Sequence, residues 1–232
     1  MTQRQQARPG GAKARILLVD DHAVVRFGIA QLINRQPDLE VCGEEENAGA
    51  ALSAAERLKP DLVIADLSLK DSSGLELVRN LKARFPTMPI LVLSVHDESV
   101  YAEVAFRAGA HGYLMKDQAL EKVLEAIRRV LGGSVYVSDA MAVKLLQKQL
   151  QGHGVSGTSP ADLLSDRELE VFELIGRWKT TRQIAQELHI SVKTVEYYRE
   201  QIKRKLGLKN AAELVQHATA WVERTASQRP PG

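Results

Sequence analysis

Short apolar runs alternate five times with helical patterns between residues 16 and 131, and this alternation narrows the possible folds more than any other feature. The apolar, β-rich runs lie at 16–19, 40–43, 62–65, 90–93 and 112–115. Apolar residues at helical spacing follow each of them, at 23–35, 48–59, 74–85, 99–108 and 120–131. Strands that are apolar at nearly every position are typical of a parallel sheet that helices cover on both faces. The sequence therefore predicts a doubly wound α/β domain of (βα)5 type over residues 14–131.

The rest of the chain is too long to be a mere tail. With 232 residues in total, two domains of unequal size are expected. Hydrophobic residues at 44% and charged residues at 26% are typical of a globular protein rather than a disordered or fibrous one. No apolar run is long enough to span a bilayer and the first fifteen residues lack a secretory signal, so a cytoplasmic protein without a membrane partner is expected. The single cysteine excludes an internal disulfide.

A linker and a small helical domain are predicted after the α/β domain. The linker covers residues 132–160, with a short helix at 141–150 and a glycine-rich tether at 152–160. Capping-box patterns start two helices, Ser165 with Glu168 and Thr180 with Gln183. The expected domain, residues 161–222, is all-α with four helices, ending near 176, 188, 206 and 219.

Polar side chains follow four of the predicted strands. Asp20 and Asp21 follow the first strand, Asp66 the third, Ser94 the fourth and Lys116 the fifth. In an open α/β sheet, ligands bind at the carboxyl ends of the strands, where these side chains would meet. Each aspartate alone could simply cap the next helix. Together, three carboxylates repel one another unless a cation neutralises them, and oxygen ligands of this kind suit Mg²⁺.

These residues resemble the receiver domain of bacterial two-component response regulators. The resemblance rests on residues 17–22 (LLVDDH), 61–67 (DLVIADL) with Gly74, Ser94, and 109–116 (GAHGYLMK). It implies that Asp66 is the phosphoacceptor and that Mg²⁺ is held by Asp20, Asp21, Asp66 and the backbone carbonyl of Ser68. It further implies that Lys116 pairs with the phosphoryl group and that Ser94 and Tyr113 form the switch. Two departures from the pattern are Lys70 and Asp117, which stand where many receivers have proline.

The third helix of the C-terminal domain is rich in basic residues. Residues 191–209 contain six basic and two acidic side chains, and residues 180–206 have the helix, turn and second helix of a DNA-binding motif. On a helical wheel, the inward side of this helix carries Val195, Tyr198, Ile202 and Leu206. On charge alone, a solvated basic helix in a small bundle explains the pattern equally well. The residues predicted to contact DNA are Thr181, Arg182, Lys193, Thr194, Glu196, Tyr197, Glu200, Lys203 and Arg204.

The order of residues in this domain favours the DNA-binding interpretation. Residues 164–171, 183–195 and 205–210 look like the LuxR-type helix-turn-helix, and a receiver followed by that domain is the arrangement of the NarL/FixJ class. This resemblance implies a transcription regulator rather than an enzyme. Its expected partners are a sensor histidine kinase that phosphorylates Asp66, double-stranded DNA, RNA polymerase, and a second copy of the chain in a homodimer formed on phosphorylation.

Two other functions are alternatives to a response regulator. A Mg²⁺-dependent phosphohydrolase would use Asp66 or Asp20 as a nucleophile, but no further acid or base residue is evident. A LuxR-type receptor for a small signal molecule would need a pocket with aromatic walls, whereas only 5% of the chain is aromatic. A small phosphodonor separates the three hypotheses, because it would label a receiver stoichiometrically, turn over on an enzyme, and leave a receptor unlabelled.

Overall fold

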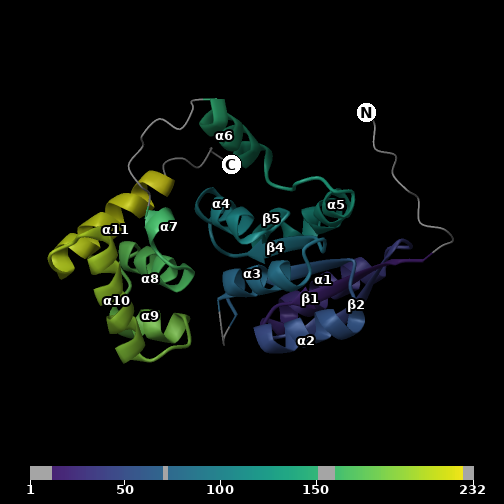
Figure 1. Ribbon diagram of the computed structural model, residues 1–232, viewed down its shortest axis with the longest axis horizontal. Helices are drawn as coiled ribbons and strands as arrows, with labels where there is room; N and C mark the ends of the chain where they lie inside the picture. The colour runs from purple at the N-terminus through teal and green to yellow at the C-terminus, as the bar shows by residue number, and fades with distance from the viewer. Residues whose placement is uncertain (1–11, 70–72, 151–159, 227–232) are drawn as a thin grey trace. The chain divides into compact units, whose positions relative to one another are not determined.

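The computed structural model describes residues 12–69, 73–150 and 160–226, which form two compact units that divide between Ser138 and Asp139 (Figure 1). The predicted tether at 152–160 lies outside the described residues except for Pro160. Among the helices that the structure describes, none is long and apolar enough to cross a membrane.

The first unit is built on one parallel sheet of five strands. Its spatial order is β2-β1-β3-β4-β5. The strands are β1 (Ala14–Val19), β2 (Leu39–Glu45), β3 (Leu62–Asp66), β4 (Ile90–Ser94) and β5 (Gly112–Met115). The order reverses at β1, so the loops after β1 and β3 leave the sheet next to each other, which is where ligands bind in such sheets.

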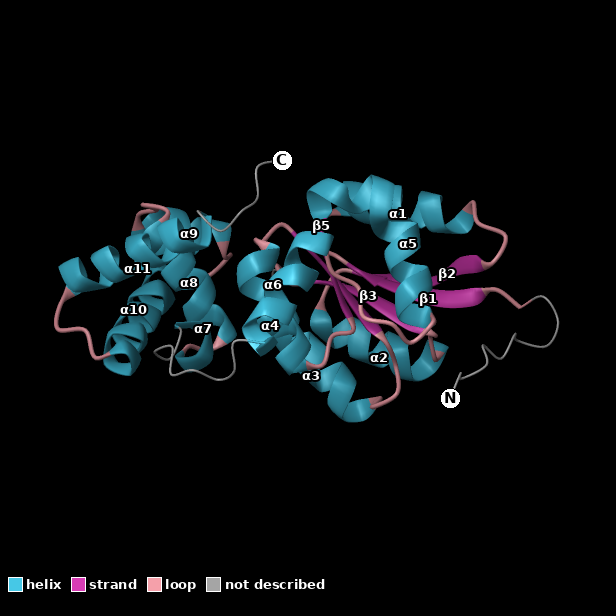
Figure 2. Cartoon of the chain, turned by 90° about the horizontal axis from the view of Figure 1, so that it is seen from above, coloured by secondary structure: helices cyan, strands magenta, loops and turns pink. Residues whose placement is uncertain are grey.

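Helices cover both faces of this sheet. They are α1 (Ala23–Asn34), α2 (Ala48–Leu58), α3 (Gly74–Arg84), α4 (Glu98–Ala108) and α5 (Ala119–Leu131), and the short 3₁₀ helix η1 (Lys116–Gln118) precedes α5. Figure 2 shows α1 and α5 on one face and α2, α3 and α4 on the other. The predicted doubly wound (βα)5 fold is confirmed.

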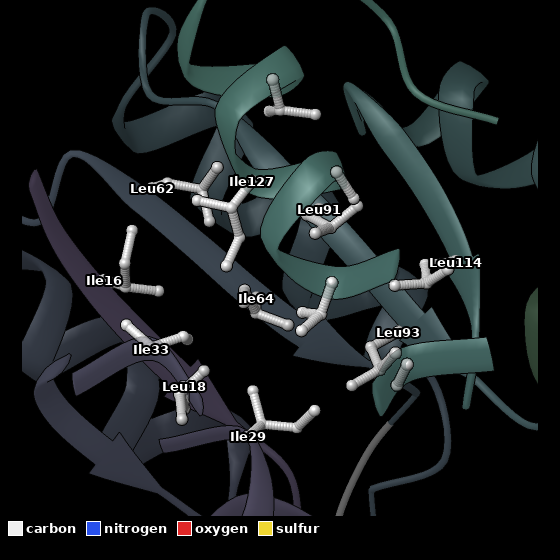
Figure 3. Close-up of a cluster of buried hydrophobic side chains, with 14 of the residues drawn as sticks. Ile16, Leu18, Ile29, Ile33, Leu62, Ile64, Leu91, Leu93, Leu114 and Ile127 are labelled. Carbon is white, nitrogen blue, oxygen red and sulfur yellow. The ribbon is translucent and has the colours of Figure 1, made fainter. Parts of the chain in front are cut away.

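The core between the sheet and the helices α1 and α5 explains why the strands are so apolar (Figure 3). Ile16 and Leu18 point to this side of β1, whereas Leu17 and Val19 point to the other side because side chains alternate along a strand. All four residues are at most 2% exposed. From Ile16 to Val19, burial on both faces leaves no position for a polar side chain, and Asp20 follows directly after the strand.

The edge strand β2 is longer than its apolar run predicts. The sequence pattern places it at 40–43, but backbone pairing with β1 extends it from Leu39 to Glu45. Its last residues are polar because an edge strand faces solvent on one side. Hydrophobicity therefore underestimates the length of this strand.

The backbone after α5 adds to the opposite edge of the sheet. Tyr136 forms a parallel bridge with Gly112, and its carbonyl accepts a hydrogen bond of 2.8 Å from the Tyr113 N–H. The Tyr136 N–H in turn donates to the His111 carbonyl at 3.1 Å. Two residues later, the Ser138 N–H donates to the Glu98 carboxylate at 2.8 Å. The segment 134–138 is thus fixed to β5 and to the first turn of α4.

The second unit is all helical. Its elements are α6 (Asp139–Leu150), α7 (Pro160–Leu163), α8 (Asp166–Gly176), α9 (Thr181–Glu187), α10 (Val192–Leu206) and α11 (Ala211–Ala226). The turn α7 was not predicted, and α11 runs about two turns beyond the predicted end at 219. The apolar pattern of α11 continues, because Trp221 packs against Phe172 of α8 with ring centroids 5.5 Å apart. The predicted set of four main helices, α8 to α11, is confirmed.

Glu168 joins the start of α8 to the end of α10. Its carboxylate accepts from the Ser165 N–H at 2.6 Å, as the predicted capping box requires, and also lies 2.6 Å from Lys205 Nζ. Burial alone would raise the pKa of Glu168, but the hydrogen bonds from Lys205 and Ser165 outweigh it and lower the pKa below the usual 4.5. The charged carboxylate therefore stabilises the helical unit.

Replacing Glu168 by glutamine should lower the free energy of unfolding by about 1 kcal/mol at neutral pH, the size of a partly exposed ion pair. A lowered pKa stabilises the folded state above the unfolded-state pKa, and this contribution disappears as the pH falls through the folded-state pKa. The difference between the two proteins should therefore shrink below about pH 4.5. Urea unfolding at pH 7 and pH 4 measures it, and an equal difference at both pH values would contradict the assigned role of the charge.

Candidate functional site

Three carboxylates meet where β1 and β3 end. Asp20 and Asp21 follow β1 directly, and Asp66 is the last residue of β3. Their side chains are 7%, 4% and 0% exposed. One ligand atom from each of them and one from His22 all lie within 4.8 Å of one another. The structure thus brings the predicted acidic residues together in one buried cluster.

Two basic side chains, Lys116 and His22, lie against these carboxylates. Lys116 Nζ is 2.7 Å from Asp66 Oδ2 and 2.6 Å from Asp20 Oδ2, and its side chain is 8% exposed. His22 Nδ1 is 2.7 Å from Asp21 Oδ1 and more exposed. His22 was not among the predicted site residues. Its place directly after Asp21, at the end of a buried strand, was the signal that could have identified it.

The environment of Asp66 raises the pKa of its carboxyl group above the ordinary value. Burial is the main cause of a raised pKa, the nearby Asp20 raises it further, and the Lys116 ammonium opposes both. The ion pair with Lys116 therefore offsets the cost of burying the Asp66 charge only in part.

The cluster fits a divalent cation. Within the described part of the chain, Asp20 Oδ2 and Asp21 Oδ1 are buried and accept no hydrogen bond of ordinary geometry, although Lys116 and His22 lie close to them. Three carboxylates in one buried cluster repel one another, and an all-oxygen set of few protein ligands suits Mg²⁺, which keeps several waters. The donor set thus matches the predicted cofactor.

A second group of contacts connects Asp66 to β4 and β5. The Ser68 N–H donates to Asp66 Oδ1 at 3.1 Å, and Ser68 Oγ lies 2.9 Å from His96 Nε2. The His96 N–H donates to Ser94 Oγ at 3.1 Å, and the Tyr113 hydroxyl donates to the His96 carbonyl at 2.9 Å. His96 therefore links the two predicted switch residues to Ser68.

Sequence reasoning missed His96. It stands two residues after Ser94, just beyond the end of β4, where a side chain can reach the neighbouring loop from β3. That position was the available signal. The structure shows hydrogen bonds of Ser68 through its N–H and hydroxyl groups, and the role of its carbonyl as a metal ligand stays a prediction.

The two departures from the receiver pattern have different outcomes. Lys70 lies outside the described residues. Asp117 follows Lys116 through a trans peptide bond, since the described residues contain no cis peptide, and both belong to the 3₁₀ turn η1. Lys116 reaches Asp66 without the cis bond that a proline would allow.

In the helical unit, α9 and α10 form a helix-turn-helix with a small core. Val195 and Ile202 of α10 are buried, together with Ile184 of α9. Tyr198 and Leu206, also predicted to face inward, are half-buried. Of the predicted DNA contacts, the exposed ones are Arg182, Lys193, Glu196, Tyr197, Glu200 and Arg204, whereas Thr181, Thr194 and Lys203 are half-buried.

Both acidic residues on the exposed face of α10 have cationic neighbours one turn later. Glu200 lies 2.8 Å from Lys203, and Glu196 lies 3.8 Å from Arg199. These pairs reduce the repulsion that two carboxylates would exert on a phosphate backbone. Arg204 donates to Gln201 and stays exposed.

Comparison with known proteins agrees with this pairing of units. Residues 16–128 match the family model of the response regulator receiver domain, and residues 162–218 match that of the bacterial regulatory proteins of the luxR family. The oxygen regulatory protein NreC of Staphylococcus haemolyticus (strain JCSC1435) is 37% identical over 208 residues, which cover 88% of this chain and 96% of the relative. The chain belongs to the NarL/FixJ class of response regulators.

Other relatives of this response regulator support the assignment. NreC of Staphylococcus carnosus (strain TM300) is 36% identical with the same coverage. Among solved structures, a LuxR-family two-component response regulator from Aurantimonas sp. SI85-9A1 is 34% identical with a TM-score of 0.56, over 60% of this chain and 99% of that chain. RcsB of Salmonella enterica serovar Typhimurium, solved bound to a promoter with the phosphomimetic BeF3-, is 25% identical with a TM-score of 0.58, over 90% and 100%.

Membership in this class gives the two units their general roles. The response regulator consists of a receiver domain and a LuxR-type DNA-binding domain, and the family regulates transcription. Receiver domains typically bind Mg²⁺ at an acidic pocket, and the cluster of Asp20, Asp21 and Asp66 is such a pocket here.

Proposed function

We propose that a sensor histidine kinase transfers a phosphoryl group to Asp66 and that this modification switches DNA binding by the C-terminal helix-turn-helix. The observation that carries the proposal is the buried Asp66 carboxylate, paired with Lys116 at 2.7 Å and adjacent to the buried carboxylates of Asp20 and Asp21. This arrangement supplies a nucleophile, a fixed cation and metal ligands within one site.

In the proposed transfer, an Asp66 oxygen attacks the phosphorus atom of the phosphohistidine. The O–P bond forms as the N–P bond breaks, and the released imidazole nitrogen takes up a proton. When bound, Mg²⁺ held by Asp20, Asp21, Asp66 and the Ser68 carbonyl would neutralise negative charge on the phosphoryl oxygens. Lys116 already lies beside Asp66, so it pairs with the transferred group without a large movement.

The signal then passes through the contacts around His96. A phosphoryl group on Asp66 brings nearly two negative charges and strong acceptor oxygens, which attract the Ser94 hydroxyl. In the structure, Ser94 Oγ accepts a hydrogen bond from the His96 N–H. The carbonyl of the same residue, His96, accepts a hydrogen bond from the Tyr113 hydroxyl. Movement of Ser94 breaks the first of these bonds, so the His96 backbone can move together with the Tyr113 hydroxyl that its carbonyl holds. The switch acts on the loop between β4 and α4.

On the output side, α10 is the proposed reading helix. Lys193, Tyr197 and Glu200 lie on its exposed face and are assigned to base edges, and Lys203 and Arg204 to phosphates. A single small domain of this kind contacts limited DNA, so a homodimer formed on phosphorylation would engage two half-sites. RNA polymerase is the expected further partner on the promoter.

Incubation with ³²P-labelled acetyl phosphate and Mg²⁺ tests the proposal against the two alternatives. Stoichiometric, hydroxylamine-sensitive labelling supports a receiver. Continuous release of phosphate at many turnovers per minute would support a phosphohydrolase, and the absence of label would support a small-molecule receptor. Labelling by a purified histidine kinase domain then tests the donor.

Binding of beryllofluoride, a phosphoryl mimic, should shift the full chain from monomer to dimer. The physical reason is that the mimic stabilises the switched state of the receiver, which is the state proposed to pair. Sedimentation velocity with and without beryllofluoride and Mg²⁺ measures the shift. An unchanged sedimentation coefficient over the accessible protein concentrations would contradict the dimer.

Charge removal on α10 should weaken DNA binding in a salt-dependent way. Arg204→Ala, or Lys203→Ala, should reduce affinity for every sequence and lower the slope of log K against log salt by about one if the residue neutralises one phosphate. Tyr197→Ala should instead change which sequences are preferred. Equilibrium titrations at three salt concentrations measure both effects, and three variants with unchanged slope and preference would show that α10 is not the reading helix.

A further inference from the structure

Trp178 combines two unusual properties. Its side chain is 72% exposed, whereas the other tryptophan, Trp221, is only 5% exposed. Its backbone has a φ of +61°, in the left-handed region that bulky side chains rarely adopt. The residue lies between α8 and α9, just before the helix-turn-helix. Packing within its own domain explains neither property.

The hydrogen bonds at the end of α8 show why the backbone takes this conformation. The Trp178 N–H donates to the Ile175 carbonyl at 3.0 Å, and the Lys179 N–H donates to the Leu174 carbonyl at 3.0 Å. This pair of bonds is the Schellman motif, which usually has glycine at the left-handed position. Glycine holds two other left-handed helix ends, Gly109 after α4 and Gly207 after α10, and lysine holds a third, Lys59 after α2. At Trp178 a large aromatic ring replaces glycine, at a cost in folding free energy.

Backbone strain that glycine would relieve often occurs at residues with a function. His189 ends α9 with a φ of +52° in the same type of motif, but histidine enters the left-handed region more readily than most residues. Trp178 is the stronger outlier because its ring is large and, being exposed, is not stabilised by burial. The ring is therefore exposed to solvent just before the N-terminus of α9.

The surroundings of Trp178 belong to the DNA-binding motif. Two residues later, Thr180 caps α9, with the Thr180 N–H donating to Gln183 Oε1 at 2.8 Å. The flanking Arg177 and Lys179 are 50% and 40% exposed and pair with carboxylates, Glu173 at 2.5 Å and Glu187 at 3.3 Å. In helix-turn-helix domains the first helix crosses the DNA backbone, and α9 is that helix. Trp178 therefore lies two residues before Thr180, the N-cap of the helix that is expected to cross the DNA backbone.

We propose that Trp178 contacts the sugar–phosphate backbone of duplex DNA, a role that rests on the proposed use of α9 and α10 for DNA binding. The indole N–H can only donate a hydrogen bond, and a phosphate oxygen can accept it. The apolar ring faces can pack on a deoxyribose. Since the indole carries no charge, this contact adds affinity for all sequences without releasing counterions, unlike the contacts of Lys203 and Arg204.

Fluorescence tests the contact directly in the full chain. The protein has two tryptophans, and Trp221 is only 5% exposed against Phe172, so acrylamide should quench mainly Trp178. The probe is a duplex selected from random-sequence DNA by repeated retention on the beryllofluoride-treated protein. Saturation with this duplex should protect the quenchable fraction, and Trp178→Phe should remove the quenchable fraction itself. A Trp178 signal that stays fully quenchable on saturated DNA overturns the proposal.

Two substitutions separate the ring from the backbone conformation. Trp178→Gly should raise the thermal midpoint of unfolding because it relieves the left-handed strain, and Trp178→Asn fits the same conformation with less flexibility. Both should weaken DNA binding about three- to tenfold, the loss of one hydrogen bond, with the salt slope unchanged. Unchanged affinity in both variants overturns the proposal, whereas a changed slope would mean that the loop, not the ring, was altered and also counts against it.

The same measurements keep this inference distinct from the proposed function. A protein that retains no duplex at all would overturn the DNA-binding function and this inference with it. Retained duplex with loss of affinity in Arg204→Ala, but no effect at Trp178, overturns this inference alone.

Discussion

Asp66→Asn is expected to abolish phosphoryl labelling by acetyl phosphate, because an amide has no anionic oxygen to attack phosphorus. The effect should be complete rather than graded, since the Asp66 carboxylate is fully buried and paired with Lys116. The amide keeps the shape of the side chain, so the fold should persist. Incorporated label per chain, measured after rapid gel filtration, gives the result, and label at the wild-type level would refute the assignment of Asp66.

Asp21→Asn is the matched control for this experiment. It removes one charge from the same cluster but leaves the nucleophile, so the maximum label should stay near the wild-type level while the required Mg²⁺ concentration rises. A Mg²⁺ titration of the initial labelling rate distinguishes the two variants. Equal Mg²⁺ dependence of Asp21→Asn and wild type would remove Asp21 from the metal site.

Gly74→Ala should impair both stability and labelling, because no side chain fits at this position. A Cβ on Gly74 would lie 2.1 Å from the Asp66 carbonyl oxygen and 2.4 Å from the Leu67 Cα, both backbone atoms. The chain after Asp66 must therefore move, at a cost of about 1–3 kcal/mol, as for other overpacked sites. Displacement of a reacting group by about 1 Å reduces rates about 100-fold. Urea unfolding and the initial labelling rate measure the two losses.

Gly28→Ala provides the control for Gly74→Ala. Gly28 lies within α1, and a Cβ there would meet no atom within 4 Å. Alanine in a helix should raise stability by about 0.5–1 kcal/mol and leave the labelling rate unchanged. If both variants lose labelling equally, the close approach of Gly74 to the Asp66 loop is not the cause.

The sequence predicted most of the receiver fold because its strands are buried on both faces. Continuous apolar runs such as 62–65 are unambiguous, and the polar residue that ends each run marks the ligand-binding edge. Prediction failed where tertiary contacts decide the outcome. Edge strand β2 has polar residues at its end, and its length depends on pairing with β1 rather than on hydrophobicity.

For the candidate site, the sequence predicted which chemical groups are present but not all of the contacts between them. Asp20, Asp21, Asp66 and Lys116 could be identified because their positions after the strands are regular. His96 could not, because its contacts with Ser68 and Ser94 depend on the path of two loops. The left-handed conformation of Trp178 was equally hidden, because nothing in a tryptophan predicts a position that usually requires glycine.

The segment 134–138, which pairs with β5 through Tyr136, has a consequence for any isolated receiver. A fragment ending at residue 131 would leave the His111 carbonyl and the Tyr113 N–H without their backbone partners and expose an open strand edge. Open edges recruit strands from other molecules, so the shorter fragment should aggregate, whereas one ending after Ser138 keeps its own edge covered. Residues 134–138 thus protect the edge of the sheet from pairing with other molecules. Slow hydrogen exchange at the Tyr113 amide would show that this segment is paired with β5.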